Sequence, residues 1–170
     1  IIDRRSIPIN PEDNVGDIHD RLMMLGAELT IDTVQRILDG NLTTTPQDEL
    51  TKGVEPTPAP KIFKETCHID WTRNARDIHN LVRGLSPYPA AWCELVSPDN
   101  DIKTIKIFAT AVTDDNASAE PGTIKSDNHR MLIACGDKWL EVLSLQLSGK
   151  RRMDTAEFLR GFNPAAYKAQ

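Results

Sequence analysis

The chain has 170 residues, of which 39% are hydrophobic and 5% aromatic, and its net charge at pH 7 is −5. This length allows one ordinary domain or one small domain with an appendage, and no apolar run approaches the roughly 20 residues of a membrane span. Residues 1–65 carry the whole net charge, which argues against a general polyanion binder but leaves room for a local basic patch within residues 66–170.

Three widely spaced cysteines, Cys67, Cys93 and Cys135, form no CxxC pair. This pattern predicts free thiols in a reducing cytoplasm and no zinc site. The chain begins with Ile1 instead of Met, and its first residues lack the layout of a signal peptide. We therefore expect a fragment of a longer cytoplasmic protein.

Residues 1–40 predict one strand followed by two helical segments. Gly26 is expected to interrupt the helical pattern, and Gly40 is placed to cap its end in a left-handed conformation. About 40 residues cannot bury an independent core, so the apolar helix faces need a partner. The expected elements are a strand at 2–9, a turn at 10–13 and helices over 15–25 and 31–38.

Residues 41–65 change character, because Thr, Pro and other polar residues dominate and no apolar period survives. The stretch PTPAP at 56–60 cannot form a helix and favours polyproline-like extension. The segment is therefore predicted to be a semi-rigid linker.

Residues 66–170 predict a self-sufficient α+β unit: a small OB-like β-barrel with one helix packed on it and a short C-terminal helix. The first helix has one apolar face, and turn signals separate the strands that follow. The expected elements are a helix over 73–85, short strands over 91–96, 104–112, 131–134 and 140–147, and a helix over 155–160.

The stretch RGLSPYP at 83–89 predicts a rigid corner between the first helix and the first strand. Gly84 or Ser86 is expected to end the helix, Pro87 prevents its continuation, and Pro89 fixes φ again before the strand. Three nearby aromatic residues are expected to pack in the core rather than stack on bases: Trp71, Tyr88 and Trp92.

Four segments occur in the order found in a known family: IDW at 69–71, AxxIxNxVRGLSPYPAA at 75–91, PGTI at 121–124, and LSLQLSGKRRM with EFLRG over 143–161. This set resembles the C-terminal domain of the methionyl-tRNA formyltransferase family. Residues 2–40 resemble the last strand and helices of that family's Rossmann-like catalytic domain.

The resemblance implies an enzyme that transfers a formyl group from 10-formyltetrahydrofolate to the amino group of initiator methionyl-tRNA. Residues 1–40 would end the catalytic domain, 41–65 would be the linker, and 66–170 would be an OB-like tRNA-binding domain. The family's catalytic Asn, His and Asp match no position here, so we expect no catalytic residue, cofactor or metal in this chain. The implied partners are initiator methionyl-tRNA and a missing N-terminal catalytic domain.

Basic side chains are the candidates for RNA contact, through phosphates. Lys150, Arg151 and Arg152 form the only run of three basic residues, in a loop between a strand and a helix, where OB-like folds meet nucleic acid. Lys61 and Lys64 precede IDW, where the resemblance also places lysines. Arg76 completes the set.

Each candidate has a structural alternative. The basic triplet also fits a solvated loop, and the lysines fit ordinary linker solubility. Arg83 shares a helix side with Arg76, yet it fits equally well as a pin for the corner made with Gly84, Pro87 and Pro89. His19 and His79 are expected at a surface or an interface of amphipathic helices.

The sequence is also compatible with two other functions. One is a related formyltransferase or hydrolase that uses the same folate donor on a non-RNA substrate, such as a nucleotide-sugar amine. The other is a stand-alone interaction module.

Overall fold

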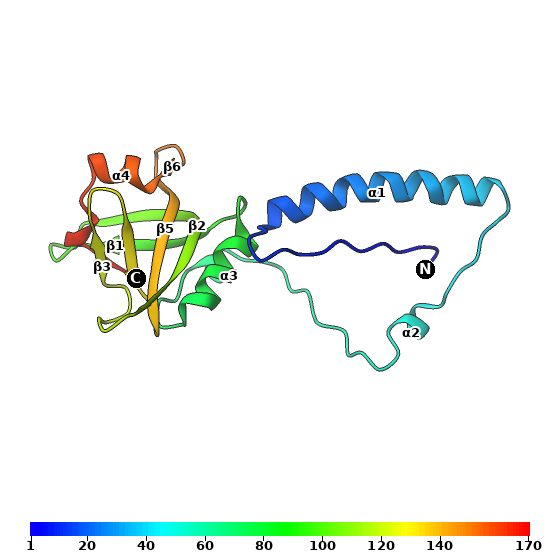
Figure 1. Ribbon diagram of the computed structural model, residues 1–170, viewed down its shortest axis with the longest axis horizontal. Coiled ribbons are helices and arrows are strands. Elements are labelled where there is room, and N and C mark those ends of the chain that lie inside the picture. The colour runs from blue at the N-terminus through cyan, green and yellow to red at the C-terminus, as the bar shows by residue number, and fades with distance from the viewer. The chain divides into compact units, whose positions relative to one another are not determined.

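The computed structural model describes residues 1–170, which separate into two units: an N-terminal unit, Ile1–Lys61, and a barrel unit, Ile62–Gln170 (Figure 1). None of the helices in either unit has the length and apolarity needed to cross a membrane.

A single helix, α1 (Val15–Leu38), runs through both helical segments predicted for the N-terminal unit. The predicted interruption at Gly26 is therefore wrong. One internal glycine costs a helix only about 1 kcal/mol relative to alanine, which is too little to end 24 helical residues. The Asn14 side chain caps the first turn, and the Asp17 carboxylate accepts a hydrogen bond from the Asn14 backbone N–H. Gly40 has a φ of 70°, which confirms the predicted left-handed cap.

Residues 2–9 form no strand, contrary to the prediction. A strand needs a neighbouring strand to complete its hydrogen-bond ladder. Here Ile1 alone exchanges backbone hydrogen bonds with a distant residue, Thr45, and residues 2–9 have no such partner. Ion pairs instead join the segment to α1, including Asp3 with Arg36 at 2.9 Å. The expected linker contains one short helix, α2 (Gln47–Leu50), that the sequence pattern did not predict.

The N-terminal unit has no core of its own along α1, because every residue of that helix keeps some exposure to solvent. Met23, Ile31 and Leu38 are among its well-exposed apolar side chains. The prediction that these helical residues cannot bury an independent core is confirmed.

The barrel unit is one antiparallel sheet with the strand order β3-β4-β5-β2-β1-β7, and β6 pairs with β5. Its elements are η1 (Glu65–Cys67), α3 (Ala75–Leu85), β1 (Ala91–Val96), β2 (Ile102–Asn116), β3 (Ile124–Ser126), β4 (Met131–Ala134), β5 (Lys138–Leu147), β6 (Met153–Asp154), α4 (Thr155–Gly161), η2 (Pro164–Ala166) and β7 (Lys168–Ala169).

A bridge between Thr123 and Lys168 joins the two ends of the strand order and closes the barrel. Next to it, the Ala169 backbone N–H donates to the carbonyl of Gly122 at 2.8 Å. Gly122 has a φ of 84°, and a Cβ there would lie 2.1 Å from the Ala169 carbonyl oxygen. The barrel closes where it does because residue 122 is a glycine, and the predicted α+β barrel is confirmed.

The core lies inside the barrel and under α3. Inward residues of β1, β2, β4 and β5 fill it, and α3 packs its apolar face against the sheet (Figure 1). At one end of the barrel α4 contributes Phe158 to the same core. Trp71 is buried, as predicted.

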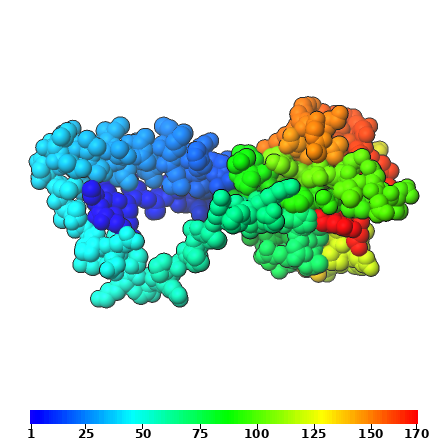
Figure 2. Space-filling view, turned by 180° about the vertical axis from the view of Figure 1, so that it is seen from behind, coloured from blue at the N-terminus to red at the C-terminus, as the bar shows by residue number.

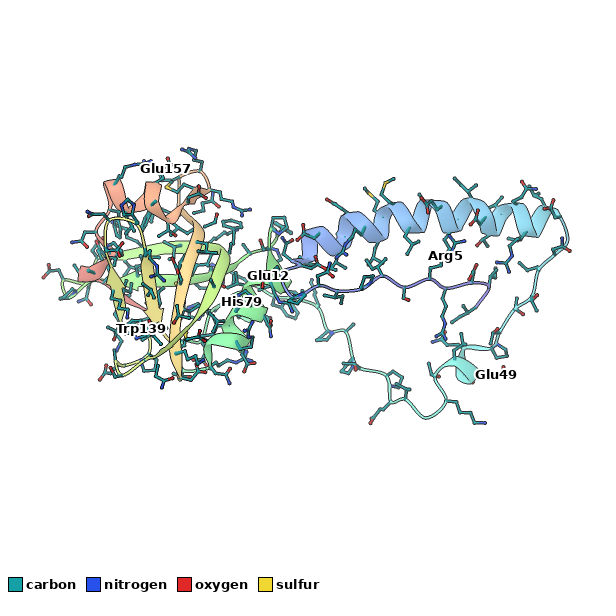
Figure 3. The ribbon with its side chains drawn as sticks, in the orientation of Figure 1. Arg5, Glu12, Glu49, His79, Trp139 and Glu157 are labelled. Atoms are coloured by element: carbon teal, nitrogen blue, oxygen red, sulfur yellow. The ribbon has the colours of Figure 1, made fainter.

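His79 is only 6% exposed, so the prediction of a surface or interfacial place is wrong (Figure 3). It lies on α3 four residues after Ala75 and three before Val82, inside the apolar stripe rather than beside it. Its Nδ1 is 3.0 Å from the Thr110 hydroxyl oxygen on β2, which gives the buried ring a polar neighbour.

The corner differs from the prediction at one residue. Helix α3 continues through Gly84 to Leu85 and ends at Ser86, which has an extended conformation with ψ of 134°. Of the two predicted helix ends, Ser86 is therefore confirmed. Tyr88 is 83% exposed, so its predicted place in the core is wrong. The corner turns the chain while holding the Tyr88 ring outside.

Candidate nucleic-acid interface

The basic loop, residues 148–152, links β5 to β6 through an ordered turn. Gly149 has a φ of 77°, and the Lys150 backbone N–H donates to the Leu147 carbonyl at 2.9 Å. The Gln146 side chain donates to the Lys150 carbonyl at 2.7 Å. In Figure 2 the loop and α4, in orange, make a raised part of the barrel unit's surface.

The three basic side chains of the loop have different surroundings. Arg151 pairs with Glu157, which lies on α4 (Figure 3). Arg152 donates to the Ser144 hydroxyl at 2.9 Å, and its guanidinium carbon lies 4.6 Å from the centre of the Phe108 ring. Lys150 is exposed and makes no ion pair. A phosphate could therefore bind the Lys150 ammonium directly, whereas at Arg151 it would compete with the Glu157 carboxylate.

Lys64 lies beside Trp92 of β1. Its carbonyl accepts the Trp92 indole N–H at 2.9 Å, and its ammonium is 5.0 Å from the centre of the Trp92 ring. These contacts fix the Lys64 backbone against the outside of the barrel, while the ammonium stays on the surface.

Lys106, which the sequence analysis did not single out, connects these two groups. It is exposed on β2, directly opposite Trp92 of β1 on one side and Gln146 of β5 on the other. Neighbouring strands are about 4.8 Å apart, so a row of roughly 10 Å runs from Trp92 to Gln146 on the outer face. Lys64 lies at one end of this row and Lys150 beside the other end.

We call this surface the basic face and define it by five residues: Lys64, Lys106, Lys150, Arg151 and Arg152. The signal for Lys106 was available in the sequence, since Ile105-Lys106-Ile107 alternates apolar and polar residues within a strand. What the sequence lacked was the pairing of β2 with both β1 and β5.

The other predicted RNA-binding residues lie outside the row. Arg76 is exposed on α3, and Lys61 is exposed at the end of the N-terminal unit. Arg83 donates to the Asn80 side chain at 2.9 Å, a contact within α3. Their roles in RNA binding or in the corner stay predictions.

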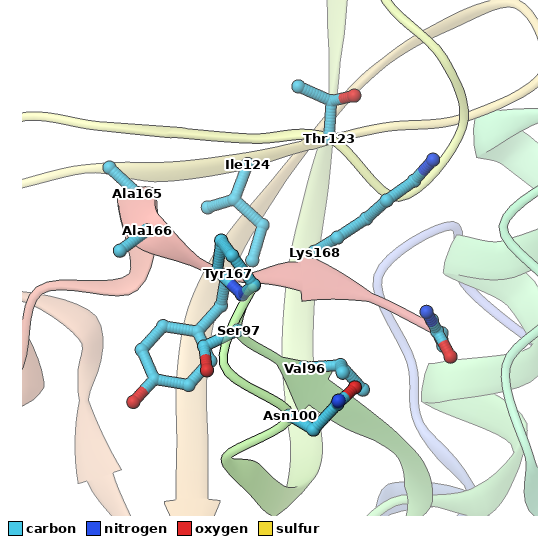
Figure 4. Close-up of a pocket in the computed structure, with 11 residues that line it drawn as sticks. Val96, Ser97, Asn100, Thr123, Ile124, Ala165, Ala166, Tyr167 and Lys168 are labelled. Atoms are coloured by element: carbon cyan, nitrogen blue, oxygen red, sulfur yellow. The ribbon is translucent and has the colours of Figure 1, made fainter.

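A hollow of about 510 Å³ beside β7 has a different character (Figure 4). The Tyr167 hydroxyl donates to Asp101 at 2.7 Å, and Lys168 pairs with Glu120 at 2.8 Å. Bonds from Lys103 and then Tyr167 lower the pKa of Asp101, which keeps that carboxylate charged. Since the cations here are matched by carboxylates, this hollow does not favour a polyanion.

The barrel unit contains no activated thiol. All three cysteines are free and buried, as predicted. Burial raises the pKa of Cys93 and of Cys135 to about 12, so both are protonated at neutral pH. No group of three or more His, Cys, Asp or Glu side chains is placed to hold a metal ion.

Comparison with known proteins gives consistent matches. Residues 61–163 match the family described as formyl transferase, C-terminal domain. The methionyl-tRNA formyltransferase of Bacteroides fragilis is 46% identical over 164 residues, which are 96% of this chain and 51% of that protein. That of Parabacteroides distasonis is 44% identical over 168 residues, 98% of this chain and 52% of that protein.

The chain thus spans about half the length of the curated relatives it matches. Among solved structures, a variant of HypX from Aquifex aeolicus has a TM-score of 0.47 and 17% identity over 79% of this chain and 24% of that one. The family resemblance predicted from the ordered motifs is confirmed.

Proposed function

We propose, since this chain belongs to the family of formyl transferase C-terminal domains, that it is the tRNA-binding portion of a methionyl-tRNA formyltransferase. In this proposal residues 1–40 end the catalytic domain, 41–65 form the linker and 66–170 hold the tRNA. The whole cytoplasmic enzyme would transfer a formyl group from 10-formyltetrahydrofolate to initiator methionyl-tRNA. The named relatives do not favour a non-RNA substrate or a stand-alone module.

The basic face is the observation that carries the proposal. Three lysines and two arginines gather around one outer surface of β1, β2 and β5, although the chain as a whole is acidic. Local cations of this kind bind phosphates, position the nucleic acid and read little sequence. We expect weak, salt-sensitive binding that discriminates poorly among tRNAs, with recognition of the initiator supplied elsewhere in the enzyme.

The proposal gives residues 1–170 a part in binding and none in the chemical step. His79 is packed against Thr110, and His68 lies edge-on to Trp92 with ring centres 4.4 Å apart. The family's catalytic Asn, His and Asp match no position in this chain. We therefore expect no formylation when the chain is incubated with methionyl-tRNA and 10-formyltetrahydrofolate.

The test is a titration of the 170-residue chain with initiator tRNA over a range of salt concentrations. A triple variant, Lys150→Ala, Arg151→Ala and Arg152→Ala, should bind more weakly at about 50 mM salt. Each duplex phosphate contact contributes about −0.9 to the salt slope, so the variant should flatten the slope by up to about 3.

A matched control removes the same charge from positions outside the basic face: Lys125→Ala on β3, Lys138→Ala at the start of β5 and Lys168→Ala on β7. It should keep most of the affinity. Equal losses in the two triple variants would show a nonspecific charge effect and contradict the proposal, and so would a wild-type chain without measurable binding at low salt.

A further inference from the structure

A groove of about 370 Å³ lies at one end of the basic face, between the segment before α3 and the outer side of β1 and β2. This volume lies in the range of small-ligand sites. Aromatic residues Phe63, Tyr88 and Trp92 line it together with Lys64 and Lys106, and no carboxylate lines it. The groove therefore combines flat apolar surfaces with positive charge.

Tyr88 is the most exposed of the three aromatic residues, since 83% of its surface is open to solvent and so to a ligand. Its backbone is restrained on both sides: Pro87 and Pro89 each fix φ, and the Ala90 N–H donates to the Leu85 carbonyl at 2.9 Å. Lys106 donates to the Pro89 carbonyl at 3.2 Å, which ties the corner to β2. Because the backbone is already restrained and a tyrosine side chain has only two χ angles, little freedom is lost when a ligand stacks on Tyr88.

We infer that this groove holds one unpaired nucleotide of a bound RNA, with its base stacked on Tyr88 and its phosphate held by Lys106 and Lys64. Aromatic rings bind the faces of bases that are free of a stack, and lysines bind the phosphate of the same nucleotide. Inside a duplex each base face is covered by its neighbours, so a duplex offers phosphates but no free base face away from its ends, and the aromatic lining distinguishes the two kinds of RNA.

The inference rests on the proposed function, because Lys64 and Lys106 belong to the basic face. It adds a second kind of contact to that surface. Phosphate contacts at the basic loop would hold paired RNA, and the groove would select a nucleotide beside it that is not paired. Stacking tolerates any base, so the groove would confer a preference for single strands without reading a sequence.

The experiment compares two labelled RNAs by fluorescence anisotropy with the 170-residue chain: a six-nucleotide single strand of mixed sequence and a blunt-ended duplex. Tyr88→Leu removes the aromatic face, and Tyr88→Phe keeps it as the matched control. Removing an aromatic residue on which a base stacks raises Kd roughly 5- to 150-fold. Tyr88→Leu should weaken single-strand binding by this range, and Tyr88→Phe should retain wild-type affinity.

Lys106→Ala tests the phosphate part of the groove. It should weaken single-strand binding and reduce the salt slope by about 0.7, the value for one contact to a single strand. Lys103→Ala is its control, since Lys103 lies on the same strand but pairs with Asp101 at 2.8 Å outside the groove. That variant should bind as the wild type does. A melting curve for each variant checks its fold.

The outcomes separate the inference from the proposed function. If Tyr88→Leu binds the single strand as tightly as wild type while the triple loop variant loses tRNA, the groove inference is overturned and the proposed function remains. Equal weakening of single strand and duplex by Tyr88→Leu also overturns the inference, since the loss would be general. A wild-type chain that binds neither RNA overturns both.

Discussion

Glu157 limits the charge that the basic loop presents, because its carboxylate pairs with Arg151. Arg151 is well exposed and Glu157 is half-buried, and an ion pair this open to solvent contributes at most about 1 kcal/mol. A phosphate has to displace Glu157 before it can use Arg151 fully. We therefore expect the loop to bind phosphate less strongly than three free basic residues would.

Glu157→Gln should raise tRNA affinity at low salt, by about two- to fivefold if the displaced pair is worth up to 1 kcal/mol. Glu141→Gln is a matched control, because Glu141 on β5 pairs with Arg130, which immediately precedes β4. Titration with initiator tRNA measures the effect. Equal gains in both variants would assign it to net charge, and no gain would show that Arg151 takes no part.

Gly122 is a residue whose replacement should damage the closure of the barrel. A Cβ there would lie 2.1 Å from the Ala169 carbonyl oxygen at a φ of 84°. We expect Gly122→Ala to lower the free energy of unfolding by about 2–4 kcal/mol, through backbone strain and the displaced β7.

Gly84→Ala is the control for this change, because Gly84 lies in α3 with open space around its Cβ position. It should be neutral or stabilise the barrel unit by up to about 1 kcal/mol. Denaturant unfolding of both variants and the wild type measures the difference. Equal stability of Gly122→Ala and wild type would mean that closure does not depend on this glycine.

The buried thiols give the barrel unit a pH dependence at the alkaline end. The pKa of Cys93 and of Cys135 is about 12 in the fold, because burial disfavours the thiolate, whereas an unfolded thiol titrates near 8.5. The unfolded state therefore loses protons first, and stability falls as pH rises above about 8.5.

Each thiol should remove up to about 1.4 kcal/mol of unfolding free energy per pH unit in this range. Denaturant unfolding at about pH 8, 9 and 10 measures the slope. Cys93→Ala should flatten it, although the small cavity lowers stability at every pH. An unchanged slope in that variant would contradict the role given to Cys93.

At the scale of the elements, the sequence predicted the helices and strands that are long enough to show a repeating pattern of apolar residues. The stripe on α3 and the alternation in β1 were recognisable because each repeats over several residues, and β4 and β5 were recognisable as runs rich in apolar residues. Strands β3, β6 and β7 have only two or three residues and show no period. Their existence depends on pairing between distant segments, such as the bridge from Thr123 to Lys168.

Helix α1 shows the opposite error, in which a local signal was given too much weight. Gly26 has open space around its Cβ position and lies inside the helix. Gly26→Ala should therefore stabilise α1 by about 0.5–1 kcal/mol and raise the helical circular dichroism signal. Gly40→Ala should do the reverse, because Gly40 has a φ of 70°. Loss of helix in Gly26→Ala would favour the predicted interruption after all.

At the scale of the whole molecule, the sequence indicated candidate basic residues, and only the fold shows how they are arranged. Lys64 and the basic loop were recognisable because they lie in or next to family motifs. Lys106 was missed because its position depends on two strand pairings, with β1 and with β5. Tyr88 was misplaced because a Tyr between two prolines fits a buried corner as well as an exposed one, and burial is a tertiary property.

The two units should differ in protection from hydrogen exchange. The barrel unit buries a continuous core, whereas α1 of the N-terminal unit contains no buried residue. Helices without a packed face open readily, since most helical stability comes from tertiary packing. In a proven monomer, amides of residues 1–40 should exchange much faster than those of β1, β2 and β5.

A chain starting at Ile62 should then keep the melting temperature of the barrel unit, within a few degrees. It should also bind tRNA at least as tightly, because the deleted residues carry the excess of acidic side chains. Equally slow exchange in both units, or loss of the barrel's transition on deletion, would show that the N-terminal unit is part of one cooperative structure.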